Sequence, residues 1–245
     1  MAKHLDTEIK VDQAKIPLRV YIEPRRNVRI AVGKKHVILR MPRGLKSAEV
    51  DDYLDWAEKW VTKQYHTTDT LKNRFVLKEY KTGDTITVQD VTYELSISEE
   101  DRKSHAGKII GNRIILQLSK NDKELNTQRA IKRLLSRLIS HSFLPEITAR
   151  VHELNNQFFK KEIKSVKLKY NTSNWGSCSS KGNVNLSSRL LFAPKDIIDY
   201  VIIHELAHLI ELNHSARFWS LVRNAMPNYK QKEKWLKVHS SSCDF

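Results

Sequence analysis

The sequence predicts an α+β fold, in which a strand-rich N-terminal region with one helix precedes a helical half with a small sheet. Apolar residues alternate with polar ones over much of the first 120 residues, as they do in half-buried strands. Beyond this point they recur at the spacing of a helix, and the composition changes at 121–127. We therefore predict an N-terminal region of residues 1–120 and a second domain of residues 121–245.

The N-terminal region is expected to begin with strands between about residues 16 and 41, with a hairpin turn at 33–36. Ser47 is expected to cap a helix that runs to about Tyr65, because acidic residues in its first turn suit the helix dipole. Trp56 and Trp60 belong to the apolar face of this helix, so we expect both in the core.

Further strands are expected between about residues 75 and 118, where apolar residues again alternate. Gly83 and Gly111 mark turns between them. Residues 98–107 are polar and are predicted to form a loop.

The second domain is expected to begin with a long helix that Asn126 or Thr127 caps and that Pro145 kinks. His141 and His152 lie in this helix. Neither has a second ligand at metal-binding spacing, so we expect both to be structural or exposed to solvent.

Two strands are predicted next, at 165–170 and 184–192, with a loop at 171–183 between them. Lys195 or Asp196 then begins a strongly apolar helix. This order would place an edge strand beside that helix, where an extended peptide could pair with it.

The apolar helix contains a His-Glu-x-x-His motif formed by His204, Glu205 and His208. An α-helix turns by about 100° per residue, so the two imidazoles can converge on one metal ion. Glu205 then points to one side, where it can act as base for a metal-bound water. Chance matches to this motif occur, but apolar residues crowd it here, and buried histidines need partners.

His214 is the candidate third ligand. In a straight helix it would lie about 80° from the ligand face, so the helix must end before it. Asn213 offers that ending, because asparagine tolerates the left-handed conformation, and Ser215 is a good N-cap for the next helix. The alternative is that His214 belongs only to the connecting loop. Tyr200 lies one turn before His204 and is expected to pack in the core.

Only two cysteines are present, Cys178 and Cys243, which excludes a disulfide framework and a four-cysteine zinc site. Cys178 is expected to be a packed thiol, and it is the sole conceivable fourth protein ligand. No apolar run is long enough to span a membrane, and the charged N-terminus lacks the apolar core of a signal peptide. We therefore expect a cytoplasmic location and no membrane partner.

The charge balance points to anionic partners. The 43 Lys and Arg residues exceed the 28 Asp and Glu residues, for a formal net charge of +15. Such an excess favours nucleic acid, a nucleotide or an acidic protein as the partner. The alternative is that the charge only keeps the protein dispersed.

Two segments, NWGSCSSKGNVNLSSRLLFAP at 174–194 and IIHELAHLIELNHSARFW at 202–219, resemble the YgjP-like and SprT-like group of zinc-dependent hydrolases. RRNVRIAVGKKHVILRMPRG at 25–44 is similar to the strand-rich leader of the YgjP-like members. The resemblance implies a minigluzincin-like, and so gluzincin-like, catalytic domain at 121–245. It also implies Zn²⁺ held by His204, His208 and His214, with Glu205 as the catalytic residue.

The chain departs from the family pattern at two positions. The family usually has Arg before the Trp-Gly-Ser-Cys loop and Asn in the following strand, where this chain has Asn174 and Ser187. If the missing arginine normally grips a phosphate or a carboxylate, nucleotide binding is less secure here.

We expect a zinc-dependent hydrolase, most simply a metallopeptidase in which Glu205 assists attack of a zinc-bound water on the amide of a peptide or protein substrate. Two alternatives stay open. A nucleoside triphosphate (UTP) pyrophosphatase, an activity attributed to YgjP-like members, would use the same metal site, although magnesium and carboxylates suit polyphosphates better. A nucleic-acid-associated protein with structural zinc would need a fourth ligand.

Overall fold

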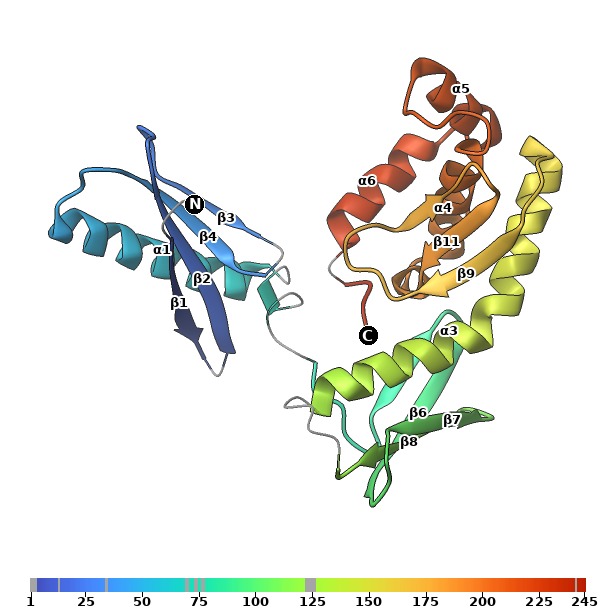
Figure 1. Ribbon diagram of the computed structural model, residues 1–245, viewed down its shortest axis with the longest axis horizontal. Coiled ribbons are helices and arrows are strands. Elements are labelled where there is room, and N and C mark those ends of the chain that lie inside the picture. The colour runs from blue at the N-terminus through green and yellow to red at the C-terminus, as the bar shows by residue number, and fades with distance from the viewer. Residues whose placement is uncertain are drawn as a thin grey trace. The chain divides into compact units, whose positions relative to one another are not determined.

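The computed structural model describes residues 4–12, 14–33, 35–68, 71–72, 75, 78–121, 127–240 and 242–245. The chain divides into two compact units, Met1–Lys78 and Glu79–Phe245, each with its own apolar core. No helix in the described ranges is both long and apolar enough to cross a bilayer. The fold is α+β, as predicted, and Figure 1 shows its elements.

The first unit is a four-stranded sheet with one helix on its apolar face. The sheet has the order β1-β2-β4-β3, in which β2 and β4 are parallel and the other neighbours are antiparallel. Its elements are β1 His4–Val11, β2 Ala14–Glu23, β3 Arg29–Val32, β4 Val37–Pro42 and α1 Ser47–Thr67. Every second residue is buried in β4 and in β2 from Ile16 to Val20, as alternation predicts.

Three details of this unit differ from the prediction. The strand β1 was not expected, because only Ile9 and Val11 of its eight residues are buried and the remainder are exposed. Ser47 is the first residue of α1 rather than its cap, and the backbone N–H of Lys46 donates to Glu49. Trp56 is 42% exposed, because the apolar stripe that faces the core is narrower than the sequence pattern indicates.

The second unit begins with another four-stranded sheet, of order β5-β6-β8-β7. Its strands are β5 Thr85–Val88, β6 Val91–Glu100, β7 Ala106–Ile110 and β8 Arg113–Ser119. Gly83 and Gly111 both adopt positive φ, at 92° and 54°, which confirms the two predicted turns. The loop predicted at 98–107 is shorter in the structure, because β6 continues to Glu100, where it still pairs in parallel with Ser119 of β8.

The helix α3, Thr127–Leu154, runs along the second unit and contains Pro145. It changes direction along its length in Figure 1, as a proline inside a helix predicts. Thr127 is its first described residue, and the alternative cap Asn126 lies outside the described residues. His141 and His152 are exposed, as expected.

A three-stranded sheet of order β10-β11-β9 follows α3. It consists of β9 Ser165–Lys169, β10 Gly176–Cys178 and β11 Asn183–Ser187, after a π-helical turn at Asn155–Phe159. The predicted loop at 171–183 therefore contains a strand, β10, at the sheet edge. The predicted strand 184–192 ends at Ser187, because Ser187 caps a 3-10 helix at Ser188–Phe192.

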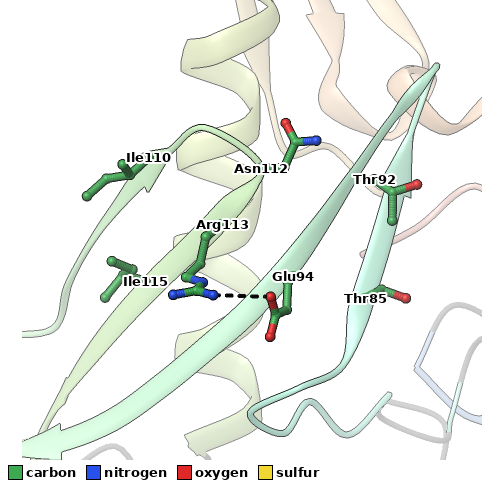
Figure 2. A pocket seen from close by; sticks show the side chains of 7 residues that line it. All are labelled: Thr85, Thr92, Glu94, Ile110, Asn112, Arg113 and Ile115. Atoms are coloured by element: carbon green, nitrogen blue, oxygen red, sulfur yellow. Dashed lines mark ion pairs between the residues drawn. The ribbon is translucent and has the colours of Figure 1, made fainter.

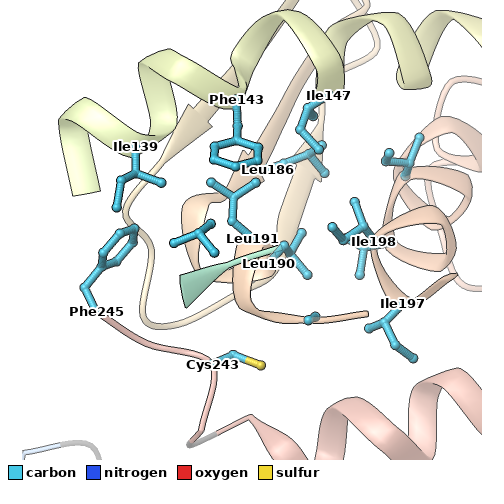
Figure 3. Packing of buried hydrophobic residues seen from close by; sticks show 14 of the residues in the cluster. Ile139, Phe143, Ile147, Leu186, Leu190, Leu191, Ile197, Ile198, Cys243 and Phe245 are labelled. Atoms are coloured by element: carbon cyan, nitrogen blue, oxygen red, sulfur yellow. The ribbon is translucent and has the colours of Figure 1, made fainter. Parts of the chain in front are cut away.

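Three helices complete the second unit: α4 Lys195–Ala207, α5 Ala216–Ala225 and α6 Tyr229–His239. Figure 3 shows how α3 covers the region after β10, with Ile139, Phe143 and Ile147 directed at Leu186, Leu190 and Leu191. Phe245 packs at the edge of the same cluster, with its ring centre 4.8 Å from that of Phe192.

The predicted boundary at residues 120 and 121 falls inside the second unit. The reason is that α3 packs against β7 and β8 as well as β9, so strands from both sides of this position share one core. Whether residues 1–120 act as one functional domain stays a prediction.

Candidate metal centre

The helix α4 positions the first two histidines of the motif. Pro194 precedes its first residue, Lys195, as the sequence predicts. His204 lies in its last turn, and His208 directly follows its end with nearly helical angles, φ −67° and ψ −15°. The four-residue spacing therefore still keeps both imidazoles on one side, with ring centres 5.2 Å apart.

The chain reverses over residues 208–215. The N–H groups of Leu209 and Ile210 donate to carbonyls three residues earlier, both at 3.0 Å, which closes the helix at Ala207. The helix thus ends six residues before Asn213, and Asn213 does not adopt a positive φ, so this part of the prediction is wrong. Ser215 does cap α5, because its hydroxyl accepts the N–H of Phe218 at 3.2 Å.

This reversal brings His214 back to the first two histidines. One ligand atom from each of His204, His208 and His214 lies within 4.8 Å of the others. The Nε2 atoms of His204 and His214 are 3.0 Å apart. His214 is exposed and the other two are partly buried, so the cluster opens to solvent on the side of His214.

The donor set fits a zinc ion. Zinc–nitrogen bonds of about 2.0–2.1 Å in tetrahedral geometry separate two ligand nitrogens by about 3.3 Å, which lies within the range of this cluster. Three neutral imidazoles would leave a fourth position open, as catalytic zinc sites do. Within the described residues, the three histidines are the one such group of potential ligands.

The protonation of the histidines also suits metal binding. Burial, together with the charges of His208 and His214, lowers the pKa of His204 to about 4. Burial also lowers the pKa of His208. Nδ1 of His208 lies 3.1 Å from the carbonyl oxygen of Glu211, which can only accept. Nδ1 therefore donates, and Nε2 keeps its lone pair for a metal.

Aromatic residues of α5 and α6 hold the three rings in place. Phe218 is fully buried, and its ring centre lies 4.9, 4.5 and 4.7 Å from those of His204, His208 and His214. Trp219 stacks on His214 at 5.7 Å and on Tyr229 at 5.3 Å. These contacts restrict the rings before any metal binds.

Glu205 is directed into the protein beside β10. It is 5% exposed, and burial raises its pKa to about 7. The neighbouring residue in β10 is Gly176, where an added Cβ would lie 2.6 Å from Oε1 of Glu205. Glycine is therefore required at this position for Glu205 to keep its place.

Cys178 does not belong to the histidine cluster. Its thiol contacts the carbonyl oxygen of Ser179 at 3.6 Å. Burial, and to a lesser extent the charge of Glu205, raises its pKa to about 12, so it is a neutral thiol at pH 7. This agrees with the predicted packed thiol.

Tyr200 is 4% exposed, with its ring centre 6.1 Å from that of His204, so it packs in the core as expected.

Of the two departures from the family pattern, Asn174 is exposed in the chain before β10, and Ser187 ends β11. Ser187 is fully buried, and its hydroxyl donates to the carbonyl of Asn171 at 2.9 Å. Arg189 places its guanidinium 4.8 Å from the ring centre of Trp175 and donates to the carbonyl of Cys243 at 2.8 Å. Arg189 thus ties the chain before β10 to the C-terminal segment.

Two residues that contact the candidate site, Gly176 and Phe218, were not predicted to do so from the sequence. For Gly176 a signal exists, because a glycine in a strand often marks a close approach of another group. Phe218 carries no such signal, since a phenylalanine is ordinary in an amphipathic helix.

A separate open hollow of about 500 Å³ lies on the sheet of β5–β8. Figure 2 shows its lining, with Arg113 paired to Glu94 at 3.5 Å and the apolar Ile110 and Ile115 beside them. It contains no histidine and does not belong to the metal centre.

Comparison with known proteins gives one family and two similar structures. The family model described as "YgjP-like, metallopeptidase domain" matches residues 26–239. The metallopeptidase zymogen abylysin of Pyrococcus abyssi is 21% identical, with a TM-score of 0.34, over 37% of this chain and 92% of that chain. The zymogen jannalysin of Methanocaldococcus jannaschii is 23% identical, with a TM-score of 0.34, over 39% of this chain and 96% of that chain. No significant match was found among curated proteins.

Proposed function

The chain belongs to the YgjP-like metallopeptidase-domain family, and from this membership we propose that it is a zinc-dependent peptidase. The observation that carries the proposal is the convergence of three histidines beside a buried glutamate. In this proposal His204, His208 and His214 hold the ion, and Glu205 is the catalytic base.

A bound zinc ion supplies a Lewis acid that lowers the pKa of water to about 7 and polarises a carbonyl. Glu205 accepts the proton of the attacking water at its carboxylate and returns it to the leaving amine. Gly176 keeps the carboxylate in position against β10.

The edge strand β10 supports a peptide as the substrate. It pairs with β11 on one side only and forms the edge of the described three-stranded sheet. The backbone groups on its other side can pair with an extended chain. Since Gly176 of this strand touches Glu205, a chain bound there would pass close to the base.

Hydrolysis of a nucleoside triphosphate is the second candidate. It is supported by the net charge of +15 and by the exposed Arg217, which lies between Ser215 and Phe218 of the site. The donor set argues against this activity, because it consists of histidines alone, whereas magnesium and its polyphosphate complexes prefer oxygen ligands.

A purely structural zinc is disfavoured by the ligand set. A closed structural site requires four protein ligands, and the described cluster has three. Cys178 lies outside it.

The proposal is tested with the zinc-loaded chain and its Glu205→Gln variant, assayed on unfolded casein and on UTP. We expect casein cleavage that falls by about 10²-fold or more in the variant, while one zinc per chain is retained. UTP hydrolysis that depends on Glu205, without casein cleavage, would favour the second candidate. Equal turnover of the two proteins would exclude Glu205 as the base.

A further inference from the structure

The four-stranded sheet of the first unit has one face that no described helix or strand of that unit covers. The buried residues of β2 and β4 belong to the apolar core with α1, so the alternate residues lie on the opposite face. Two of these, Tyr21 and Arg40, pair across the sheet, and strand register extends their row to His4 of β1 and Arg29 of β3. The guanidinium of Arg40 lies over the ring of Tyr21, 4.7 Å from its centre, and the ring of His4 flanks the same tyrosine at 5.6 Å.

Cationic residues concentrate at the same end of the sheet. The loop from β2 to β3 and the loop from β4 to α1 meet there, because the N–H of Arg43 donates to the carbonyl of Glu23 at 3.1 Å. We call this group the basic patch; it consists of Arg25, Arg26, Arg29, Arg40, Arg43 and Lys46.

The patch keeps an excess of positive charge. The nearby carboxylates are Glu23, which pairs with Arg40 and Arg25, and Glu49, which accepts the backbone N–H of Lys46. Asp6, beside His4 on the sheet face, is neutralised by its pair with Arg19. Arg26, Arg29 and Arg43 are exposed, and none forms an ion pair with another described residue. Three guanidinium groups are therefore available for an anionic partner.

We propose that this sheet face and the basic patch bind single-stranded nucleic acid. Unpaired arginines at the rim would contact phosphates, and the Arg40 guanidinium that lies over the ring of Tyr21 would provide, together with that ring, a platform on which a base can stack. A flat sheet with an aromatic ring on a central strand suits splayed bases better than a rigid duplex.

An anionic membrane matches the geometry less well. The exposed apolar residues of the sheet, Leu5 and Ile22, alternate with His4 and Tyr21 along their strands and so lie on the other face. The described residues of this face include no large apolar side chain that is fully exposed, so the surface lacks the groups that insert below lipid headgroups.

The test is fluorescence anisotropy of the intact chain with labelled oligothymidylate and oligouridylate of about 20 nucleotides, longer than the roughly 4–16 nucleotides that one single-strand-binding module covers. The variants are Arg26→Gln with Arg29→Gln, and Tyr21→Leu. Lys59→Gln with Lys63→Gln removes the same charge from exposed positions of α1, and Tyr21→Phe keeps the ring.

We expect binding by the wild type that weakens with salt. The double arginine variant should lower the slope of log affinity against log salt by about 1.4, because each lost phosphate contact of a single strand contributes about 0.7. Tyr21→Leu should weaken binding about fivefold or more without changing this slope. The lysine pair and Tyr21→Phe should remain close to the wild type.

The proposal is overturned if the wild type binds neither oligonucleotide, or if the lysine pair weakens binding as much as the arginine pair. It is also overturned if a duplex of equal length binds as tightly, or if phosphatidylserine vesicles bind in place of the oligonucleotides. Equal affinity of Tyr21→Leu and the wild type excludes the stacking platform and with it this mode of binding. Circular dichroism of each variant controls for folding.

Discussion

Gly176 and Glu205 are in such close contact that a single added methyl group would overlap the glutamate carboxylate, at 2.6 Å from Oε1. Gly176 comes from the edge strand β10 and Glu205 from the last turn of α4. The contact therefore couples the strand that would bind a peptide to the residue that would act as base.

The first prediction follows from this contact. Gly176→Ala should lower kcat by about 10²-fold, because a displacement of about 1 Å of a catalytic group has this effect. Zinc content, measured by mass spectrometry, should stay at one ion per chain. Ser177→Ala, at the next residue of β10, is the control and should leave kcat unchanged. Wild-type kcat in Gly176→Ala would show that Glu205 tolerates displacement or is not the base.

The second prediction concerns the third ligand. His214→Ala should lower zinc affinity by at least about tenfold, because a two-histidine site loses one of its three protein bonds. The melting temperature of the wild type should rise on zinc binding and fall on chelation, and His214→Ala should lose most of this difference. His152→Ala removes an exposed histidine of α3 and serves as control. Unchanged zinc affinity in His214→Ala would place His214 in the loop only.

The third prediction concerns the packing beneath the histidines. Phe218→Ala should destabilise the metal-free chain by about 3–5 kcal/mol, because the residue is fully buried. Phe218→Leu should destabilise the chain less than Phe218→Ala does. It should still weaken zinc binding, because leucine has no flat ring that can contact all three imidazoles. Denaturant unfolding and zinc titration provide the two measurements. Phe158→Leu, at a residue that is 37% exposed, should change stability by less than about 0.5 kcal/mol.

The fourth prediction concerns pH. Burial raises the pKa of Glu205 from 4.5 to about 7, so the folded metal-free chain holds its proton more tightly than the unfolded chain. The wild type therefore loses stability relative to Glu205→Gln as pH rises from about 4.5 to about 7, by about 3 kcal/mol in total. The lowered pKa of His204 has the opposite effect, because it destabilises the folded chain as pH falls below about 6.5. His204 is present in both the wild type and Glu205→Gln, so its effect cancels when their stabilities are compared. Parallel stability curves for the two proteins would contradict the raised pKa.

Local signals in the sequence predicted much of the fold correctly. Alternation identified β2, β3, β4, β5, β6 and β8, but not β7, and glycines marked turns that do require positive φ. Elements whose stability depends on a partner were missed. The strand β1 buries only Ile9 and Val11, and β10 has three residues, so neither shows a clear pattern of its own.

The predicted domain boundary differs from the compact units for a similar reason. The composition changes near residue 121, but α3 contacts strands that precede it and strands that follow it. Which residues share a core depends on contacts between distant segments, and composition along the chain does not report such contacts.

Two features of the candidate centre follow from local sequence alone. The spacing of His204 and His208 places two imidazoles on one helical face, and Ser215 caps the next helix whatever surrounds it. Only the tertiary structure decided where the helix ends, that His214 returns to within 3.0 Å of His204, and that Cys178 stays outside the cluster. It also decided that Gly176 meets Glu205. Spacing along a helix is a property of the backbone alone, whereas convergence and burial require packing between segments that the sequence keeps apart.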